Sequence, residues 1–164
     1  MKALVTGGGG FLGGAIVRKL LEREDKVRAL GRSRYPELEK LGVETVTADV
    51  RDREAVERAA QGMDIIFHVA SKVGIWGGWK DYYQTNVAGT ENVLLACRKN
   101  GISRLVYTSS PSVTYDGSDQ VDIDETQPYA EKHLCNYSRS KAMAERKVLA
   151  ENGRDGLWAV ALRP

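Results

Sequence analysis

Lys2-Ala-Leu-Val-Thr-Gly-Gly-Gly-Gly-Phe-Leu-Gly-Gly14 joins a short apolar run to a glycine-rich loop and the start of a helix. The run over residues 3–5 suits a buried parallel strand, and Gly7, Gly10 and Gly13 follow at intervals of three. In such a loop one glycine permits a positive φ, a second lets the backbone approach a pyrophosphate, and a third lets the helix pack on the strand. The stretch therefore predicts a diphosphate site at the first turn of the fold.

The helix that begins near Phe11 would direct free N–H groups and the positive end of its dipole at the anion. The same letters also fit a Gly-x-Gly-x-x-Gly spacing through Gly8, Gly10 and Gly13, so the sequence leaves two registers open. Taken alone, four consecutive glycines also fit a flexible turn. The rest of the chain has to decide between a nucleotide loop and a turn.

Tyr137-Ser-Arg-Ser-Lys141 places a phenol and an ammonium four residues apart, on one face of a helix. A neighbouring cation lowers the pKa of a tyrosine, so we expect Tyr137 to act as general acid–base and Lys141 as its electrostatic partner. Ser110 ends the apolar run that begins at Leu105, where a parallel strand presents hydroxyls at its carboxyl end. Ser109 and Ser110 are both candidates for the substrate hydroxyl contact, with Ser112 as a further one.

Apolar strand patterns alternate with helix patterns along the chain, which predicts a parallel sheet covered on both faces. We expect strands near 2–6, 26–30, 43–47, 64–69, 104–109 and 157–162, helices near 11–24, 52–61, 80–100 and 129–152, and a short helix near 36–41. Gly42, Gly62 and Gly101 fall just after helices, where a left-handed cap is favoured.

These motifs, in this order, resemble the extended short-chain dehydrogenase/reductases, the NAD-dependent epimerase/dehydratase superfamily. The similarity runs through Thr6-Gly7-x-x-Gly10-x-x-Gly13, residues 48–50, 67–70, 86–90 and 107–110, and the closing Leu162-Arg-Pro164. Residues 35–38, 72–77 and 107–113 look like the 3β-hydroxysteroid dehydrogenase group, which includes sterol-4-carboxylate dehydrogenases and bacterial 2-alkyl-3-keto acid reductases.

The resemblance implies one NAD(P)-binding domain over residues 1–164, a Rossmann-type doubly wound parallel sheet in three α/β/α layers that lacks the usual C-terminal substrate region. It implies hydride transfer between a nicotinamide cofactor and a secondary alcohol or ketone on an apolar substrate, such as a 3β-hydroxysteroid, a sterol carboxylate or a long-chain 3-keto acid. The catalytic residues would be Ser110, Tyr137 and Lys141. The cofactor would contact Gly7, Gly9, Gly10, Phe11, Leu12, Gly13, Arg32, Ser33, Asp49, Val50, Val69, Ala70, Ser71, Asn86, Tyr137 and Lys141.

The end of the second strand indicates which cofactor is preferred. NAD-binding folds place an acid there for the ribose hydroxyls, but this chain has Gly31 followed by Arg32 and Ser33. An arginine can pair with a 2′-phosphate, so we expect NADP(H) to be favoured over NAD(H). The alternative is that Arg32 and Arg34 are solvated loop charges. By resemblance Asp49 would lie near the adenine, while Asp52 is better placed to cap the next helix.

Several side chains receive a structural interpretation instead of a catalytic one. His68 has apolar neighbours and precedes the turn, so we expect a satisfied, partly buried imidazole. Cys97 lies in an apolar helix pattern and reads as a small core residue, not as a metal ligand. Asn86 is expected to support the backbone near the active site. Residues 72–80, with two tryptophans and an isoleucine between glycines, fit equally an apolar substrate wall and a surface loop.

Composition limits the remaining possibilities. The 164 residues carry a net charge of +2, which gives no case for a nucleic-acid partner. No apolar run is long enough to span a bilayer, and two cysteines without close spacing favour free thiols and a cytoplasmic setting. We expect a possible homodimer through the helices at 80–100 and 129–152, and exposed apolar surface where the substrate region would pack. Alternative functions are a nucleotide-sugar epimerase or dehydratase and a non-catalytic NADP(H) sensor.

Overall fold

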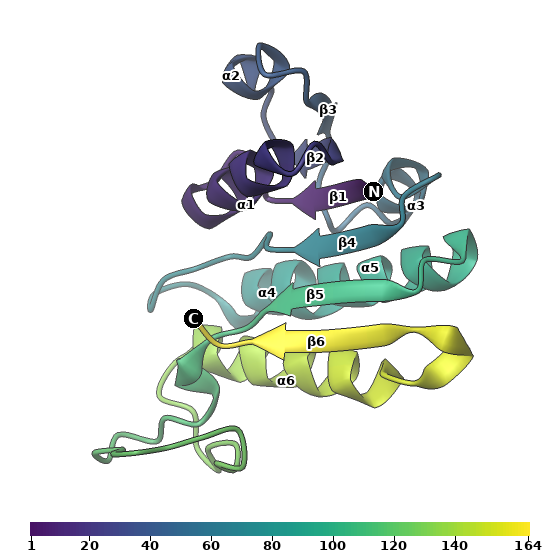
Figure 1. Ribbon diagram of the computed structural model, residues 1–164. Helices are drawn as coiled ribbons and strands as arrows, with labels where there is room; N and C mark the ends of the chain where they lie inside the picture. Colours follow the sequence, from purple (N-terminus) through teal and green to yellow (C-terminus); the bar gives the residue numbers. More distant parts are fainter.

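Six parallel strands form the centre of the fold in a computed structural model that describes all 164 residues (Figure 1). They are β1 (Lys2–Thr6), β2 (Lys26–Gly31), β3 (Glu44–Thr47), β4 (Ile65–His68), β5 (Arg104–Thr108) and β6 (Trp158–Leu162), in the order β3-β2-β1-β4-β5-β6. The order reverses between β1 and β4, which is where doubly wound folds bind their ligands. The expected sheet and all six strands are confirmed.

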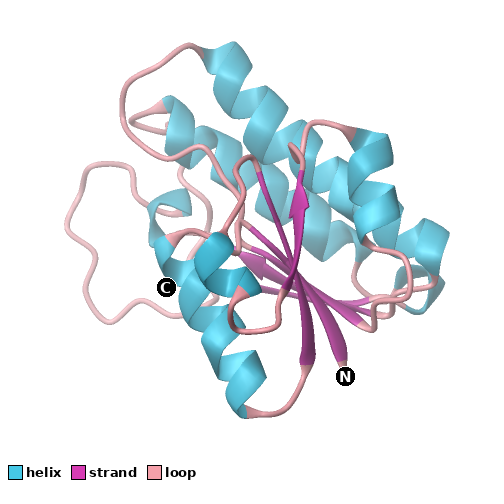
Figure 2. Ribbon diagram, turned by 90° about the horizontal axis from the view of Figure 1, so that it is seen from above, coloured by secondary structure: helices cyan, strands magenta, loops and turns pink.

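Helices cover both faces of this sheet, as Figure 2 shows from above. One face carries α1 (Phe11–Glu22) and the short α2 (Pro36–Glu39), whose Val17 and Leu38 pack with Ala3 and Val5 of β1. The other face carries α3 (Arg53–Ala59), α5 (Gly89–Asn100) and α6 (Asn136–Glu151), which enclose the larger core. Alternate residues of β1, β2, β4 and β5 pack into the two cores, so the three-layer α/β/α prediction is confirmed.

Two helix predictions were wrong in extent. The helix predicted near 129–152 begins only at Asn136, because Cys135 is extended and the preceding segment is held away from the helix axis: the N–H of Ala130 donates to the carbonyl of Val113. The helix predicted near 80–100 is divided into α4 (Trp79–Tyr82), the π-helical segment η1 (Tyr83–Ala88) and α5. Such π segments are frequent at functional sites. Two short 3-10 turns, η2 (Pro111–Val113) and η3 (Arg154–Gly156), complete the chain.

Other local predictions hold. Gly42, Gly62 and Gly101 all take positive φ, the conformation expected after a helix end. Cys97 is fully buried among core residues and free of any disulfide. No helix in the structure is both long enough and apolar enough to cross a membrane.

The α1 face of the sheet is incompletely covered at its β6 edge. Trp158, Val160 and Leu162 alternate along β6 on that face, and Trp158 is 73% exposed. The expected apolar surface is therefore present on this strand, where it adjoins the partly buried Val106 of β5.

Candidate active site

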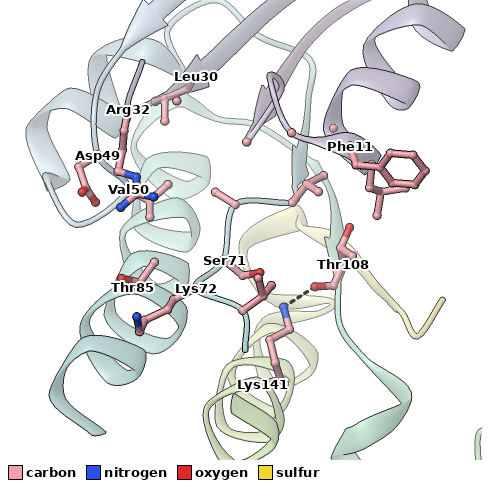
Figure 3. Close-up of a pocket in the computed structure, with 18 of the residues that line it drawn as sticks. Phe11, Leu30, Arg32, Asp49, Val50, Ser71, Lys72, Thr85, Thr108 and Lys141 are labelled. Atoms are coloured by element: carbon pink, nitrogen blue, oxygen red, sulfur yellow. Dashed lines mark hydrogen bonds between the residues drawn. The ribbon is translucent and has the colours of Figure 1, made fainter. Parts of the chain in front are cut away.

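A cleft of about 890 Å³ opens at the carboxyl ends of the strands (Figure 3). Its walls come from the glycine loop, the end of β2, residues 48–51, the turn after β4, the end of β5 and α6. The cleft thus lies at the point where the strand order reverses, which is the position that open parallel sheets use for ligands.

The glycine loop has the geometry of an anion site. Gly7 takes φ +71°, and a Cβ on it would lie 2.9 Å from the backbone nitrogen of Ala70; a Cβ on Gly13 would lie 2.1 Å from the carbonyl oxygen of Gly7. These contacts support the Gly7-x-x-Gly10-x-x-Gly13 register. Gly10 caps α1 without a side-chain hydrogen bond, and the N–H groups of residues 11–13 have no acceptor within the chain. Free donors at a helix N-terminus, with no acid in the first turn, fit a diphosphate.

The acids that follow β3 have separate roles. The Asp52 side chain accepts from the N–H of Ala55 and caps α3, as predicted. Asp49 lines the cleft and pairs with Arg51 at 2.7 Å, and this hydrogen bond holds the pKa of the Asp49 carboxyl below its usual value. The carboxylate is therefore charged at neutral pH, with Arg51 as its partner within the chain.

A buried polar relay holds the turn after β4. The Thr6 hydroxyl oxygen accepts from the N–H groups of Val69 and Ala70, so its proton is free to be donated to Nδ1 of His68 at 2.7 Å. The Nε2–H of His68 then donates to the Thr90 hydroxyl oxygen at 3.0 Å. The Thr90 hydroxyl in turn donates to the carbonyl of residue 86. Burial lowers the pKa of His68 to about 3, so the imidazole is neutral. The prediction of a satisfied imidazole is confirmed, with more complete burial than expected.

Asn86 joins the same turn to α6. Its carboxamide accepts from the N–H of Lys72 at 2.6 Å, and its NH₂ donates to the Lys72 carbonyl and to the Ser140 hydroxyl. The Ser140 hydroxyl donates in turn to the carbonyl of Tyr137. Asn86 is buried and does not line the cleft. It takes the supporting position that the sequence predicted and is not among the groups that face a ligand.

Ser110, Tyr137 and Lys141 all line one end of the cleft. Lys141 reaches up from α6, and its Nζ donates to the carbonyl of Thr108 at 2.5 Å, drawn as the dashed line in Figure 3. The same Nζ lies 4.3 Å from the centre of the Tyr107 ring. Burial lowers the pKa of Lys141 to about 7. The lysine therefore sits in a dry site next to a carbonyl and an aromatic face.

The expected lowering of the Tyr137 pKa is not found. Burial raises the pKa of this phenol, and hydrogen bonding by Ser110 opposes only part of the increase. The difference arises because Lys141 directs its ammonium to the Thr108 carbonyl, while Tyr137 is half-buried. Ser110 also shares a hydrogen bond of 2.8 Å with the hydroxyl of Ser112, which keeps its side chain at the cleft wall.

A buried ion pair supports this end of the site, and the sequence analysis did not anticipate it. Glu145, one helical turn beyond Lys141, is 1% exposed and pairs with Arg163 at 2.6 Å. The Tyr129 hydroxyl donates to the same carboxylate at 2.9 Å. Arg163 follows β6 and Tyr129 precedes α6, so these contacts join the end of the sheet and the segment before α6 to α6 itself. The only sequence signal was the spacing of Glu145 from Lys141 on one helix face.

Most of the predicted contact residues do line the cleft. They are Gly7, Gly10, Phe11, Leu12, Gly13, Arg32, Asp49, Val50, Val69, Ala70, Ser71, Ser110, Tyr137 and Lys141. Gly9, Ser33 and Asn86 do not line it. Lining residues that the sequence analysis did not assign include Tyr35, Lys72, Asp81, Thr85 and Thr108, and of these only Thr108 lies at the end of a predicted strand.

Comparison with known proteins assigns the chain to a protein family. The model of the "3-beta hydroxysteroid dehydrogenase/isomerase family" matches residues 4–164. The chain is 50% identical over 167 residues to a 2-alkyl-3-oxoalkanoate reductase of Stenotrophomonas maltophilia, covering 100% of this chain and 50% of that protein. It is 40% identical over 175 residues to a 3 beta-hydroxysteroid dehydrogenase/Delta 5→4-isomerase of Mycobacterium tuberculosis, covering 99% and 46%. The chain spans about half the length of these relatives.

Solved structures give the same fold. The Thermus thermophilus UDP-glucose 4-epimerase in complex with NAD superposes with a TM-score of 0.87 at 31% identity, covering 99% of this chain and 54% of that one. The expected superfamily is therefore confirmed by both sequence and structure.

Proposed function

Because the chain belongs to the 3-beta hydroxysteroid dehydrogenase/isomerase family, we propose that it binds NADP(H) and serves an oxidoreductase that interconverts a ketone and a secondary alcohol on an apolar substrate. The substrate we favour is a long-chain 3-keto acid with an alkyl branch, since the reductase from Stenotrophomonas is 50% identical to this chain over the 167 aligned residues. The observation that carries the proposal is the convergence of Ser110, Tyr137 and Lys141 on one end of the cleft whose other walls are the glycine loop and Arg32.

The cleft fits a dinucleotide along its length. The free N–H groups at the start of α1 suit the diphosphate, and the backbone of Gly7 and Ala70 leaves no room for a Cβ beside it. Asp49 and Val50 would flank the adenine, and Val69 to Ser71 would pass along the second ribose. When bound, the nicotinamide supplies or accepts a hydride.

Tyr137 and Ser110 perform the proton chemistry in this proposal. For reduction, the Tyr137 hydroxyl gives its proton to the substrate oxygen as the carbonyl becomes an alcohol, and the Ser110 hydroxyl donates a hydrogen bond to the same oxygen. The raised pKa of Tyr137 keeps the phenol protonated at neutral pH, which suits the acid role. Lys141 sits on the next turn of the helix, where it can bind the nearby ribose hydroxyls and stabilise the phenolate that remains.

NADP(H) is the cofactor we propose over NAD(H). Arg32 lines the cleft and forms no ion pair, whereas its neighbours Arg34 and Arg51 are engaged with Glu39 and Asp49. No carboxylate occupies the end of β2 itself, and the nearby carboxylate of Asp49 is already paired with Arg51. The NAD complexes among the structural relatives describe those proteins and leave this preference to experiment.

The test measures cofactor binding and hydride transfer separately. NADPH and NADH are titrated into the chain by nicotinamide fluorescence, with Arg32→Ala as the cofactor variant and exposed Arg18→Ala as its control. We expect Arg32→Ala to weaken NADPH about tenfold or more and to leave NADH unchanged, because a charge-assisted contact contributes about 1.5–3 kcal/mol. Equal binding of both cofactors by the unchanged chain would contradict the preference.

Turnover is then followed at the nicotinamide absorbance with a 2-alkyl-3-oxoalkanoate. Tyr137→Phe should reduce the rate by about a hundredfold or more while NADPH binding persists, since general acid catalysis contributes 10²–10⁴. An unchanged rate in this variant would refute the assignment of Tyr137. Binding without turnover by the parent chain would favour the sensor alternative.

A further inference from the structure

Two glycines of the cleft region are explained by one tyrosine. A Cβ on Gly9 would lie 2.0 Å from Cε1 of Tyr35, and a Cβ on Gly31 would lie 2.3 Å from the Tyr35 hydroxyl oxygen. Neither glycine takes a positive φ, so backbone conformation does not require them. The Tyr35 ring therefore fills the side-chain space of both residues and bridges the glycine loop to the end of β2.

The position of the hydroxyl matters because of where β2 ends. In dinucleotide folds the acid at this strand end reaches the adenosine ribose and accepts from its hydroxyls. Here the space that a side chain on Gly31 would enter contains the phenol oxygen of Tyr35 instead. The phenol is half-buried, lines the cleft and has no hydrogen-bond partner within the chain. At the site that contacts the ribose, a neutral hydroxyl that can donate a hydrogen bond has thus replaced a charged carboxylate that can only accept one.

The charges beside Tyr35 favour an anionic ligand. Arg32 is the next residue after Gly31, lines the cleft and is exposed; it forms no ion pair, and the nearby Asp49 carboxylate is paired with Arg51. A 2′-phosphate offers acceptor oxygens and negative charge, and both a phenol O–H and a guanidinium donate to such oxygens. A ribose with a free 2′-hydroxyl gains nothing from the guanidinium charge.

We propose that Tyr35 is a cofactor-selecting residue whose hydroxyl donates to the 2′-phosphate of NADP(H) beside Arg32. The inference rests on the proposed NADP(H) preference and adds the residue that enforces it at the level of the adenosine ribose. It also gives Gly31 a function: the missing side chain makes room for the phenol.

The test uses the adenosine half of the cofactor alone, so that it needs neither nicotinamide nor substrate. Adenosine 2′,5′-bisphosphate and 5′-ADP are titrated calorimetrically into the chain, its Tyr35→Phe variant, and Tyr115→Phe, an exposed tyrosine outside the cleft, as control. Tyr35→Phe keeps the ring over Gly9 and removes only the hydroxyl. We expect its affinity for the 2′,5′-bisphosphate to fall about tenfold, with 5′-ADP unchanged within about twofold.

A second arm restores the acceptor. Gly31→Asp alone should bind both ligands poorly, because its side chain meets the phenol. Gly31→Asp combined with Tyr35→Ala should reverse the preference towards 5′-ADP, since a carboxylate repels the 2′-phosphate.

The outcomes separate the two proposals. If the parent chain prefers the 2′,5′-bisphosphate and Tyr35→Phe keeps that preference, the role of Tyr35 is overturned and the NADP(H) proposal stands. If the parent chain shows no preference, both are overturned. A loss of affinity for both ligands in Tyr35→Phe, in equal measure, would show that the tyrosine only packs against the loop. None of these readings depends on turnover.

Discussion

Removing one partner of the ion pair between Glu145 and Arg163 should strongly destabilise the packing of α6. Three contacts of 2.6, 3.1 and 3.3 Å join the guanidinium to the carboxylate, and the Tyr129 hydroxyl adds a fourth at 2.9 Å. The Glu145 side chain is 1% exposed and that of Arg163 is 22% exposed. Removing either partner leaves the other charge in a site built to neutralise it.

The structure predicts unequal costs for the two single substitutions. Breaking a buried pair from one side costs about 3–5 kcal/mol, because the remaining charge is uncompensated. Arg163→Met leaves the fully buried carboxylate alone, so we expect a cost of about 3 kcal/mol in the free energy of unfolding. Glu145→Gln leaves an arginine that reaches water and a carboxamide that still accepts from Tyr129, so about 2 kcal/mol is expected. The double variant should cost about 2 kcal/mol less than the sum of the two.

Urea unfolding at pH 7, followed by circular dichroism and tryptophan fluorescence, measures these free energies. The matched control is Glu91→Gln. It breaks the ion pair between Glu91 of α5 and Lys147 of α6, in which both side chains are 39% exposed. A surface pair of this kind should cost less than about 1 kcal/mol. The reasoning fails if Arg163→Met costs no more than the control, or if the two substitutions at the buried pair are additive.

The pH dependence supplies a second check on the same pair. Burial opposes the charged form of Glu145, but the hydrogen bonds from Arg163 and Tyr129 outweigh it and lower the pKa of this carboxyl. A carboxyl with a lowered folded pKa contributes stability that is present above its unfolded pKa and is lost as the pH falls through the folded value. Glu145→Gln should therefore lose less stability than the parent chain in the acid range.

Three further predictions concern single buried groups. His68 has a folded pKa of about 3 against 6.5 when unfolded, so the parent chain should lose up to about 1.4 kcal/mol of unfolding free energy per pH unit as the pH falls from 6.5 towards 3. In His68→Gln the urea midpoint should change less between pH 7 and 5, and equal pH dependence in the two proteins would contradict this. Lys141 has a folded pKa of about 7 against 10.5 when unfolded, so above pH 7 the unfolded chain binds a proton that the folded chain has lost. The free energy of unfolding should therefore rise from pH 7 to 8.5 in the parent chain but not in Lys141→Met, as measured by the same urea unfolding assay. Asn86→Ala removes three hydrogen bonds, should cost about 2–4 kcal/mol in the free energy of unfolding and should accelerate hydrogen exchange at the Lys72 amide. Ser140→Ala removes one of the three together with the bond from Ser140 to the Tyr137 carbonyl, keeps both Lys72 contacts, and should cost about 1–2 kcal/mol without faster exchange at Lys72. Equal exchange rates at Lys72 in the two variants would refute the assigned role of the Lys72 contacts.

The strands and the glycine loop could be predicted because their causes are local. A buried parallel strand needs a short apolar run, and a loop that approaches another backbone needs glycine at fixed spacing. The contact between Gly13 and the carbonyl of Gly7 spans six positions of the sequence, within the reach of a motif. The start of α6 was misplaced because its determinant, the hydrogen bond from Ala130 to Val113, joins segments that no periodicity relates.

The electrostatics of the site could not be predicted for the same physical reason. The spacing of Tyr137 and Lys141 correctly placed both on one wall of the cleft, but the acceptor that holds the lysine is the carbonyl of Thr108, at the end of a distant strand. Arg163 was quoted only as part of a closing motif, and nothing in that motif shows that its partner is Glu145. Tyr35 was quoted only within residues 35–38. Its place beside the cleft could not be predicted, because a side chain that fills the space of two glycines leaves no periodic pattern in the sequence.

Position along α6 then determines what each polar group can do. Tyr137, Lys141 and Glu145 follow one another at intervals of four on one face, and their burial increases from half-buried to 2% and 1% exposed. Tyr137, which exchanges a proton in the proposed reaction, is the most exposed of the three, and substrate can reach it from the cleft. The lysine occupies a dry site in which its charge is costly, and Glu145 is the one neighbour found to raise its pKa against the effect of burial. Since Arg163 largely neutralises that carboxylate, loss of Arg163 should favour the charged form of Lys141 while it destabilises the fold, so activity per folded molecule and stability need not fall together.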